Sequence, residues 1–354
     1  MDKGYRKWAE VSREALVHNY EVVRARIEPS TKIMAIVKAD GYGHGSVECA
    51  KVFMEQGAAY LGVSSMGEAL VLRRFGIDAP ILVLGYVDET NLEACLEANL
   101  TFACYSLEFA EKVNRLGKAA KIHIKIDTGM NRLGFQCEAG TVDAIQRISR
   151  MENIEIEGIF SHFACESVED NRGQYEAFCG MISELEERGI DVGMRHICNS
   201  WACLNTPEFQ MDMVRVGLAL YGYGDERLRP VMEFKTIVIH NKKVPKGRGI
   251  SYGWRYKTAG DEWIATIPIG YADGFSRVMS GKAETLVRGE RKPVVGAICM
   301  DMCMVRVDED LAAGEVVTVF GEGLPATELA EWNGTIVYEI LTRIGKRVPR
   351  VMVG

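Results

Sequence analysis

The sequence contains no long hydrophobic run and no segment rich in lysine and arginine. Its 354 residues carry a formal net charge of −7, and no apolar stretch reaches the ~18 residues that a membrane span requires. The first residues, Met1–Trp8, lack the apolar core of a secretion signal. These absences argue against a membrane protein and against nucleic acid or an anionic membrane surface as a partner. We therefore expect a cytoplasmic protein.

Paired cysteines are also missing, although the chain has 10 cysteines. They lie singly, with no CxxC pair of the kind that binds zinc or forms a redox dithiol. Cys299 and Cys303 have Met-Asp-Met between them and would by themselves make only half of a metal site. We expect free thiols in a reducing compartment and no bound metal.

Strand and helix patterns alternate over most of the first 230 residues. Short apolar, β-branched runs are separated by segments with helical periodicity. The predicted strands are 33–37, 60–64, 81–84, 101–104, 121–126, 156–161, 196–198 and 213–216. Such alternation allows an open doubly wound sheet or a closed barrel, and eight regular units favour the barrel. We therefore predict an α/β domain over residues 1–230, built as a TIM-like (β/α)8 barrel.

The pattern changes after Gly224. Short β-type runs broken by glycine and proline turns then follow, at 235–239, 263–267, 284–287 and 316–320. Helix-like segments at 326–332 and 338–344 close the chain. We predict a second, mostly-β domain over residues 231–354.

The most informative stretch is Ala35–Gly45, which reads AIVKADGYGHG. Lys38 follows a buried type of strand and precedes a turn with three glycines, where α/β folds place their sites. This block resembles the cofactor-lysine motif of the alanine racemase family, in which that lysine forms a Schiff base with pyridoxal 5'-phosphate. The resemblance extends in at least six blocks from Trp8 to Arg350.

A second block, Lys125–Gly134, reads KIDTGMNRLG after the fifth strand. It is similar to the family segment whose arginine binds the substrate carboxylate, which assigns that role to Arg132. The planar guanidinium suits a carboxylate and stays protonated. The resemblance also implies that Lys125 is carbamylated, which would replace a cation near Arg132 by an anion.

Further cofactor contacts are implied after strands six to eight. His162 follows the sixth strand, and the resemblance places it near Arg215. Ser200, Gly217 and Leu218 follow strands seven and eight, where barrels bind phosphate. Together with the phenols of Tyr42 and Tyr338, these groups are the expected phosphate site.

Arg215 is the residue that distinguishes between reactions. In the family the matching arginine faces the pyridine nitrogen, where most pyridoxal enzymes place an acid. Because arginine keeps its proton, the substrate carbanion is less delocalised and returns quickly to Cα. This arrangement favours racemisation over transamination.

The second domain supplies the other catalytic base in the resemblance. Gly249–Gly253 resembles the segment whose tyrosine acts on the opposite face of Cα from the lysine, which assigns Lys38 to the D face and Tyr252 to the L face. Tyr271, Met300 and Asp301 would line the entrance and the substrate pocket. In relatives this tyrosine comes from the other subunit, so we expect a homodimer with shared active sites.

The resemblance predicts an alanine racemase that interconverts L- and D-alanine and supplies D-alanine for peptidoglycan. Serine racemases of the glycopeptide-resistance type are the closest alternative, but they carry Asn where this chain has Tyr338. A non-catalytic pyridoxal-phosphate-binding barrel would normally lack the second domain and Tyr252. A decarboxylase of related architecture would have an acid at the position of Arg215.

Overall fold

The computed structural model describes residues 4–354 and divides into two compact units. The barrel unit comprises residues 15–41 and 46–229. The β unit comprises the described part of Met1–Glu14, together with residues 42–45 and 230–354.

Eight parallel strands form the sheet of the barrel unit, in the order β10-β2-β3-β4-β5-β6-β8-β9. They are β2 (Lys32–Ile36), β3 (Tyr60–Val63), β4 (Ile81–Val83), β5 (Thr101–Cys104), β6 (Ala120–Asp127), β8 (Ile154–Phe160), β9 (Met194–His196) and β10 (Met213–Val216). The short strand β7 (Phe135–Gln136) pairs with β6. Between β9 and β10, the amide of Asp212 donates to the carbonyl of Arg195 and that of Arg215 to the carbonyl of Cys198. The predicted eight-stranded barrel is confirmed.

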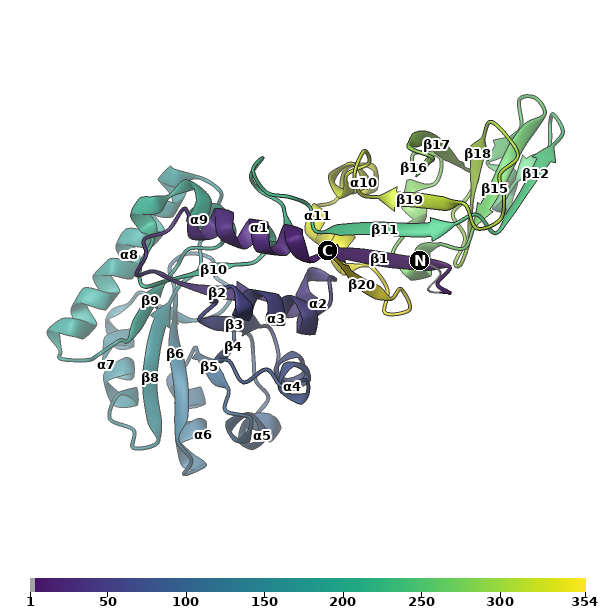
Figure 1. The fold of residues 1–354 in the computed structure, drawn as a ribbon. Coiled ribbons are helices and arrows are strands. Elements are labelled where there is room, and N and C mark those ends of the chain that lie inside the picture. The colour runs from purple at the N-terminus through teal and green to yellow at the C-terminus, as the bar shows by residue number, and fades with distance from the viewer. Residues whose placement is uncertain (1–3) are drawn as a thin grey trace. The chain divides into compact units, whose positions relative to one another are not determined.

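Helices alternate with these strands, as Figure 1 shows. They are α1 (Arg13–Arg24), α3 (Ser46–Glu55), α4 (Met66–Arg74), η1 (Glu89–Asn91), α5 (Leu92–Glu97), α6 (Leu107–Arg115), α7 (Ala139–Ile148), α8 (Val168–Glu187), α9 (Ser200–Asn205), η2 (Pro207–Phe209) and η3 (Leu218–Tyr221). Serines at 65, 106 and 167 accept amide hydrogen bonds at the starts of α4, α6 and α8. Helix α6 buries one apolar face, formed by Phe109, Ala110 and Val113.

The β unit contains a nine-stranded sheet in the order β12-β15-β18-β17-β16-β19-β11-β1-β20. Its strands are β1 (Lys7–Ser12), β11 (Met232–Ile237), β12 (His240–Val244), β15 (Glu262–Ile267), β16 (Glu284–Val287), β17 (Glu290–Val295), β18 (Cys303–Val307), β19 (Val316–Phe320) and β20 (Arg350–Val353). Strands β13 (Gly249–Ile250) and β14 (Tyr256–Lys257) form a separate pair. Short helices complete the unit: η4 (Tyr252–Trp254), η5 (Tyr271–Asp273), η6 (Arg277–Met279), α10 (Ala326–Asn333) and α11 (Val337–Thr342). The predicted mostly-β domain is confirmed.

The position of the first strand differs from the prediction that residues 1–230 form the barrel domain. Strand β1 pairs antiparallel with β11 and parallel with β20. Its apolar side chains at Ala9 and Val11 are fully buried in the β unit. The chain also ends in strand β20 after the two predicted helices, and β11 begins three residues earlier than its predicted strand. These differences arise because the pairing joins segments that are distant in the sequence.

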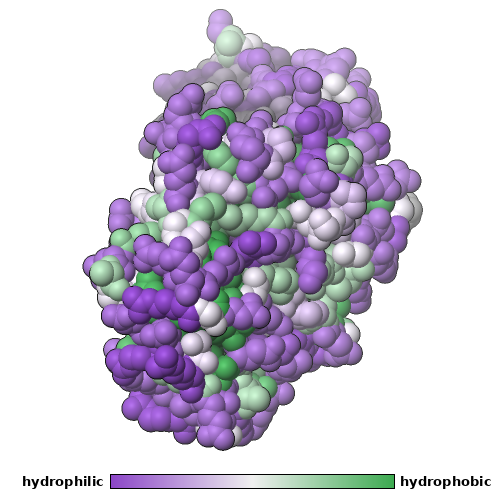
Figure 2. Space-filling view, turned by 90° about the vertical axis from the view of Figure 1, so that its left-hand side faces the viewer, coloured by the Kyte–Doolittle hydropathy of each residue, from purple (hydrophilic) through white to green (hydrophobic). Residues whose placement is uncertain are grey.

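The surface agrees with the absence of long hydrophobic runs. Among residues 4–354, no helix has the length and apolarity needed to cross a membrane. The face drawn in Figure 2 is predominantly hydrophilic, with hydrophobic residues confined to narrow areas between polar ones.

Candidate active site

Lys38 lies just beyond the carboxyl end of β2, at the start of a turn with an unusual backbone. The short element α2 (Lys38–Tyr42) is left-handed, with φ values of 52° at Ala39, 54° at Asp40 and 61° at Gly41. Tyr42 also has a positive φ, of 52°. The left-handed conformation costs about 1–2 kcal/mol per residue other than glycine. Such a turn persists only if its surroundings hold it.

Three hydrogen bonds hold this turn in place. The amide of Ala39 donates to Glu68 Oε1 over 2.7 Å, and the amide of Ser46 donates to Asp40 Oδ1 over 2.9 Å. The amide of Gly41 donates to the carbonyl oxygen of Val37. These hydrogen bonds hold the strained turn and thereby fix the position of Lys38; strained backbone of this kind clusters at functional sites.

The environment of Lys38 favours a reactive amine. Burial lowers the pKa of Lys38, and the positive charge of Arg132 lowers it further. A lysine with a lowered pKa is deprotonated more often near neutral pH. The deprotonated amine is the form that attacks an aldehyde.

Arg215, on β10, is 4% exposed and is bound through both terminal nitrogens. Its Nη1 donates to His196 Nδ1 and to the carbonyl of His196, at 2.9 and 3.0 Å. Its Nη2 donates to His162 Nδ1 at 2.9 Å and to the carbonyls of Ser161 and Ile197. Burial lowers the pKa of Arg215 to about 10, which leaves the group charged at neutral pH. Within the described residues, Nε is the guanidinium nitrogen without an acceptor, so it can donate to a ligand.

The loop that carries Arg132 is organised by Asp127. The amides of Gly129 and Asn131 donate to Asp127 Oδ1, and the amide of Arg132 donates to Oδ2, all at 3.0 Å. Burial alone would raise the pKa of Asp127, but these amides lower it. The Arg132 residue itself is exposed, so its guanidinium is accessible to a ligand.

Lys125 is buried on β6, two residues before Asp127. Its Nζ donates to the carbonyl of Ile126 over 2.6 Å and lies 5.4 Å from the ring centroid of Phe160. Burial, followed by the charge of Arg215, lowers the pKa of Lys125 to about 7. About half of this amine is then unprotonated at neutral pH, which is the form that reacts with carbon dioxide.

Ser200 lies where α9 begins, close to the loop after β10. Its Oγ accepts hydrogen bonds from the amides of Gly217 and Ala219, at 3.0 and 3.3 Å. The amide of Leu218 opens η3 and has no acceptor within that helix. The amide of Gly217 is thus used within the protein, while that of Leu218 and the Ser200 hydroxyl proton can serve an anion.

The phenols of Tyr42 and Tyr338 are brought together in the β unit. Their ring centroids are 6.0 Å apart with an interplanar angle of 42°. Burial raises the pKa of Tyr42, and Tyr338 raises it further. Tyr42 therefore stays protonated at neutral pH and keeps a hydroxyl donor.

Tyr252 belongs to a separate, exposed part of the β unit. Its residue is 72% exposed, and Trp254 and Met300 are 70% and 53% exposed. All three line a groove of about 760 Å³. Ser251, which precedes Tyr252, has a positive φ of 61°. Its hydroxyl donates a hydrogen bond to the carbonyl of Ala297. Large exposed apolar groups gathered in this way are typical of an interaction surface.

Tyr271, the first residue of η5, lies beside the loop of the β unit that carries Met300 and Asp301. The amide of Tyr271 donates to the carbonyl of Cys299 over 3.1 Å. Gly270 permits this approach, because a Cβ there would lie 2.2 Å from the Cys299 oxygen and 2.4 Å from that of Met300.

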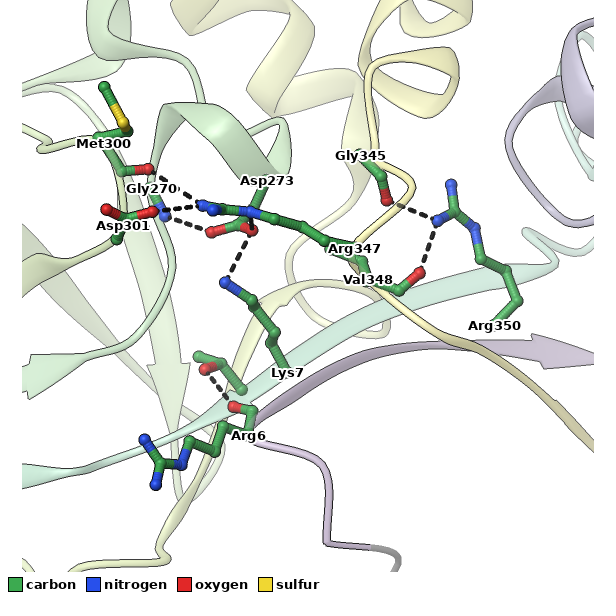
Figure 3. A network of polar contacts seen from close by, with 11 residues as sticks. Arg6, Lys7, Gly270, Asp273, Met300, Asp301, Gly345, Arg347, Val348 and Arg350 are labelled. Carbon is green, nitrogen blue, oxygen red and sulfur yellow. Dashed lines mark hydrogen bonds and ion pairs between the residues drawn. The ribbon is translucent and has the colours of Figure 1, made fainter.

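An ion-pair network fixes these loops, as Figure 3 shows. The carboxylate of Asp273 is fully buried and contacts Lys7 Nζ at 2.7 Å and Arg347 Nε at 2.6 Å. Arg347 also donates through Nη2 to Asp301 over 2.7 Å. The same network thus joins strand β1 to the loop that carries Asp301.

Comparison with known proteins identifies the family. Residues 11–225 match the family described as alanine racemase, N-terminal domain, and residues 231–352 match that described as alanine racemase, C-terminal domain. The chain belongs to the alanine racemase family.

Similar proteins cover nearly the whole length of this family member. The alanine racemase of Methanococcus maripaludis is 44% identical over 365 residues, which cover 97% of this chain and 98% of that protein. The alanine racemase of Clostridium tetani is 42% identical, with 98% and 95% covered.

Solved structures of alanine racemases share the fold. One from Clostridium difficile 630 has a TM-score of 0.96 and 41% identity, covering 99% of this chain and 97% of that one. The structure from Bacillus anthracis with bound L-Ala-P has a TM-score of 0.94 and 37% identity, covering 99% and 95%. The family membership expected from the sequence motifs is confirmed.

Several residues that organise the site of this alanine racemase family member were not predicted. Glu68 and Asp127 hold the loops of Lys38 and Arg132, and His196 contacts Arg215. The sequence contains a signal for some residues of this kind: His123 and His196 are polar residues within strands that were expected to be buried. Arg347 had no such signal, because its contacts depend on the fold of the whole β unit.

Proposed function

We propose that this protein is a pyridoxal 5'-phosphate-dependent alanine racemase that interconverts L- and D-alanine. The observation that supports this reaction most strongly is the state of Arg215. Its terminal nitrogens are bound by the protein, which leaves Nε, among residues 4–354, to donate to a ligand. A guanidinium held in this way donates a hydrogen bond to a ring nitrogen and keeps its proton.

The residues present fit the cofactor. When bound, pyridoxal phosphate supplies an electron-withdrawing ring that acidifies the Cα proton of an amino acid. Lys38 would hold its aldehyde carbon, and Arg215 its ring nitrogen. Its phosphate would be held by the Ser200 hydroxyl and the backbone around Gly217 and Leu218, with Tyr42 and Tyr338 as phenol donors. His162 would act through Arg215, since its Nδ1 accepts a hydrogen bond from Arg215 Nη2.

Racemisation requires a base on each face of Cα. We assign Lys38 Nζ to the D face and Tyr252 Oη to the L face, so that each group takes the proton in one direction and returns it in the other. Arg132 binds the substrate carboxylate through its exposed guanidinium. Tyr271, Met300 and Asp301 line the entrance, and a carbamate on Lys125 orients Arg132 by its negative charge.

The exposure of Tyr252 supports a homodimer in which the active sites are shared between subunits. Tyr252, Trp254 and Met300 form an exposed apolar group that a partner subunit would cover. In a closed twofold arrangement, each subunit would supply Tyr252 to its partner's barrel. We further propose a cytoplasmic location and the supply of D-alanine for peptidoglycan.

The substrate is tested by kinetics. Protein loaded with pyridoxal phosphate is incubated with L-alanine or L-serine, and the loss of optical rotation gives kcat/KM for each. We expect the higher value for L-alanine, because the bulky phenol of Tyr338 leaves little room for a hydroxymethyl group. A higher value for L-serine would favour the serine racemase reading, and no turnover of either would favour a binding protein.

A further inference from the structure

A chain of four polar side chains runs through the interior of the barrel unit. We call Arg215, His196, His123 and Glu157 the polar relay. His196 Nδ1 lies 2.9 Å from Arg215 Nη1, His196 Nε2 lies 2.7 Å from His123 Nδ1, and His123 Nε2 lies 3.6 Å from Glu157 Oε2. The four residues come from strands β10, β9, β6 and β8. Both imidazoles are fully buried.

The donor groups fix the direction of the hydrogens in this relay. A guanidinium nitrogen can only donate, so His196 Nδ1 must accept from Arg215. Burial and the charge of Arg215 lower the pKa of His196 well below its usual value, so the ring is neutral and carries its proton on Nε2. That proton is donated to His123 Nδ1. Burial also lowers the pKa of His123, so its own proton lies on Nε2 and faces the Glu157 carboxylate.

Both rings are held in position by their neighbours. Phe160 stacks on His196 with an interplanar angle of 3° and a centroid distance of 5.0 Å. Tyr60 packs edge-on against His123 at 5.8 Å. At Gly158, a Cβ would lie 2.7 Å from His123 Nδ1. The rings therefore have little freedom to rotate, and the relay can change mainly by moving protons between ring nitrogens.

Glu157 stays ionised at the far end of the relay. Its Oε1 accepts from Lys121 Nζ at 2.8 Å, and its Oε2 accepts from the Thr101 hydroxyl at 3.1 Å. Although burial alone would raise the pKa of Glu157, the contacts with His123, Lys121 and Tyr60 lower it. The carboxylate thus presents an acceptor to His123 at neutral pH.

We propose that Glu157 is a positioning residue for Arg215. Its carboxylate lies 3.6 Å from His123 Nε2 and favours a proton on that nitrogen. Both imidazoles then keep Nδ1 as an acceptor, and His196 Nδ1 anchors Arg215 Nη1. The reverse tautomers would place an N–H of His196 against an N–H of Arg215 at 2.9 Å. The guanidinium would then shift, and its Nε would no longer be held in position for a ligand. The expected effect on catalysis rests on the proposed function, whereas the assignment of the tautomers is independent of it.

The variant Glu157→Gln replaces the carboxylate acceptor that faces His123 by an amide donor. Lys121 requires an acceptor, so the glutamine oxygen is expected to occupy the position of Oε1. The amide nitrogen then takes the position of Oε2 and donates toward His123 Nε2. His123 Nε2 must then become an acceptor. The proton of His123 moves to Nδ1, where it points at His196. Glu155→Gln is the matched control, since it makes the same change at an exposed position on the same strand.

The first test is made on the cofactor-free protein by nitrogen-15 NMR of labelled histidines, in which two-bond correlations distinguish the two tautomers. We expect His123 and His196 to carry their protons on Nε2 in the wild type and in Glu155→Gln. Glu157→Gln should show His123 protonated on Nδ1. An unchanged tautomer in that variant would show that Arg215 alone sets the protons, and it would overturn the role of Glu157. A proton on Nδ1 of either ring in the wild type would overturn the proposal, and this result requires no variant to fold.

The second test measures alanine racemisation in both directions with the cofactor-loaded proteins. Glu157→Gln should lower kcat by roughly tenfold or more, because losing a residue that orients a ligand-binding side chain usually has an effect of that size. KM should change by less than about twofold, because Glu157 is not a proposed substrate contact. An unchanged kcat with reversed tautomers would overturn the positioning role. If the wild type does not racemise alanine, the proposed function fails, and the NMR result still decides the tautomers.

Discussion

Replacing Arg215 by lysine should destabilise the barrel while keeping its positive charge. Arg215 Nη1 and Nη2 make five hydrogen bonds, to two imidazole nitrogens and three carbonyl oxygens. The lysine ammonium has three donors, so at least two of these acceptors lose their partner. The carbonyl of His196 also accepts from the amide of Ser161, so at least one acceptor is left unsatisfied, which costs about 1–3 kcal/mol. This is a large part of the roughly 5–15 kcal/mol that stabilises a typical protein.

The assay is thermal unfolding of the cofactor-free protein followed by circular dichroism. A change of 1 kcal/mol shifts Tm by about 2–4 °C in a domain of 150–250 residues, so we expect Arg215→Lys to lower Tm by at least ~2 °C. Arg195→Lys is the control, because Arg195 pairs with Asp212 at partly exposed positions. Such a pair contributes about 0–1 kcal/mol. A Tm for Arg215→Lys within ~1 °C of the wild type would refute the reasoning.

Three further predictions concern the surrounding loops. Since the pKa of Lys125 is about 7, carbon-13 NMR with labelled bicarbonate at pH 7–8 should show a carbamate signal, and the signal should be absent in Lys125→Ala; its survival in that variant would contradict the assignment. Because the pKa of Asp127 is lowered in the fold, its stabilising effect is present above its unfolded pKa of ~3.9 and is lost as the pH falls through the folded value. The stability difference between the wild type and Asp127→Asn, measured in urea, should therefore shrink as the pH falls from about 5 to 3, and a constant difference would count against it. Gly270→Ala should cost about 1–3 kcal/mol in the same assay because its Cβ meets two carbonyl oxygens, whereas Gly260→Ala, with nothing within 4 Å, should change little; equal effects would show that the loops can adjust.

The sequence allowed the barrel to be predicted because its strands and helices alternate locally. Each of the eight barrel strands overlaps a predicted one, since apolar periodicity is a property of short segments. The pairing of β1 with β11 and β20 could not be predicted in this way. It joins the two ends of the chain, and no local pattern records which distant strand will be its neighbour.

The site was predictable to a similar extent. Lys38 and Arg215 could be placed at one end of the barrel, because the carboxyl ends of parallel strands meet there. The relay through His123 and Glu157 could not, since it depends on which side chains of different strands face one another inside the barrel. The left-handed turn after Lys38 was also not predicted, because Ala39 and Asp40 rarely adopt that backbone.

The central claim is that Lys38 and Tyr252 act as bases on opposite faces of Cα. The most direct measurement follows loss of the Cα proton of L-alanine and of D-alanine, in heavy water, by cofactor-loaded wild type, Lys38→Ala and Tyr252→Phe. The wild type should exchange and racemise both substrates. Tyr252→Phe should lose exchange of L-alanine more strongly, and Lys38→Ala should lose that of D-alanine more strongly. Equal losses for the two substrates in both variants would contradict the assigned faces.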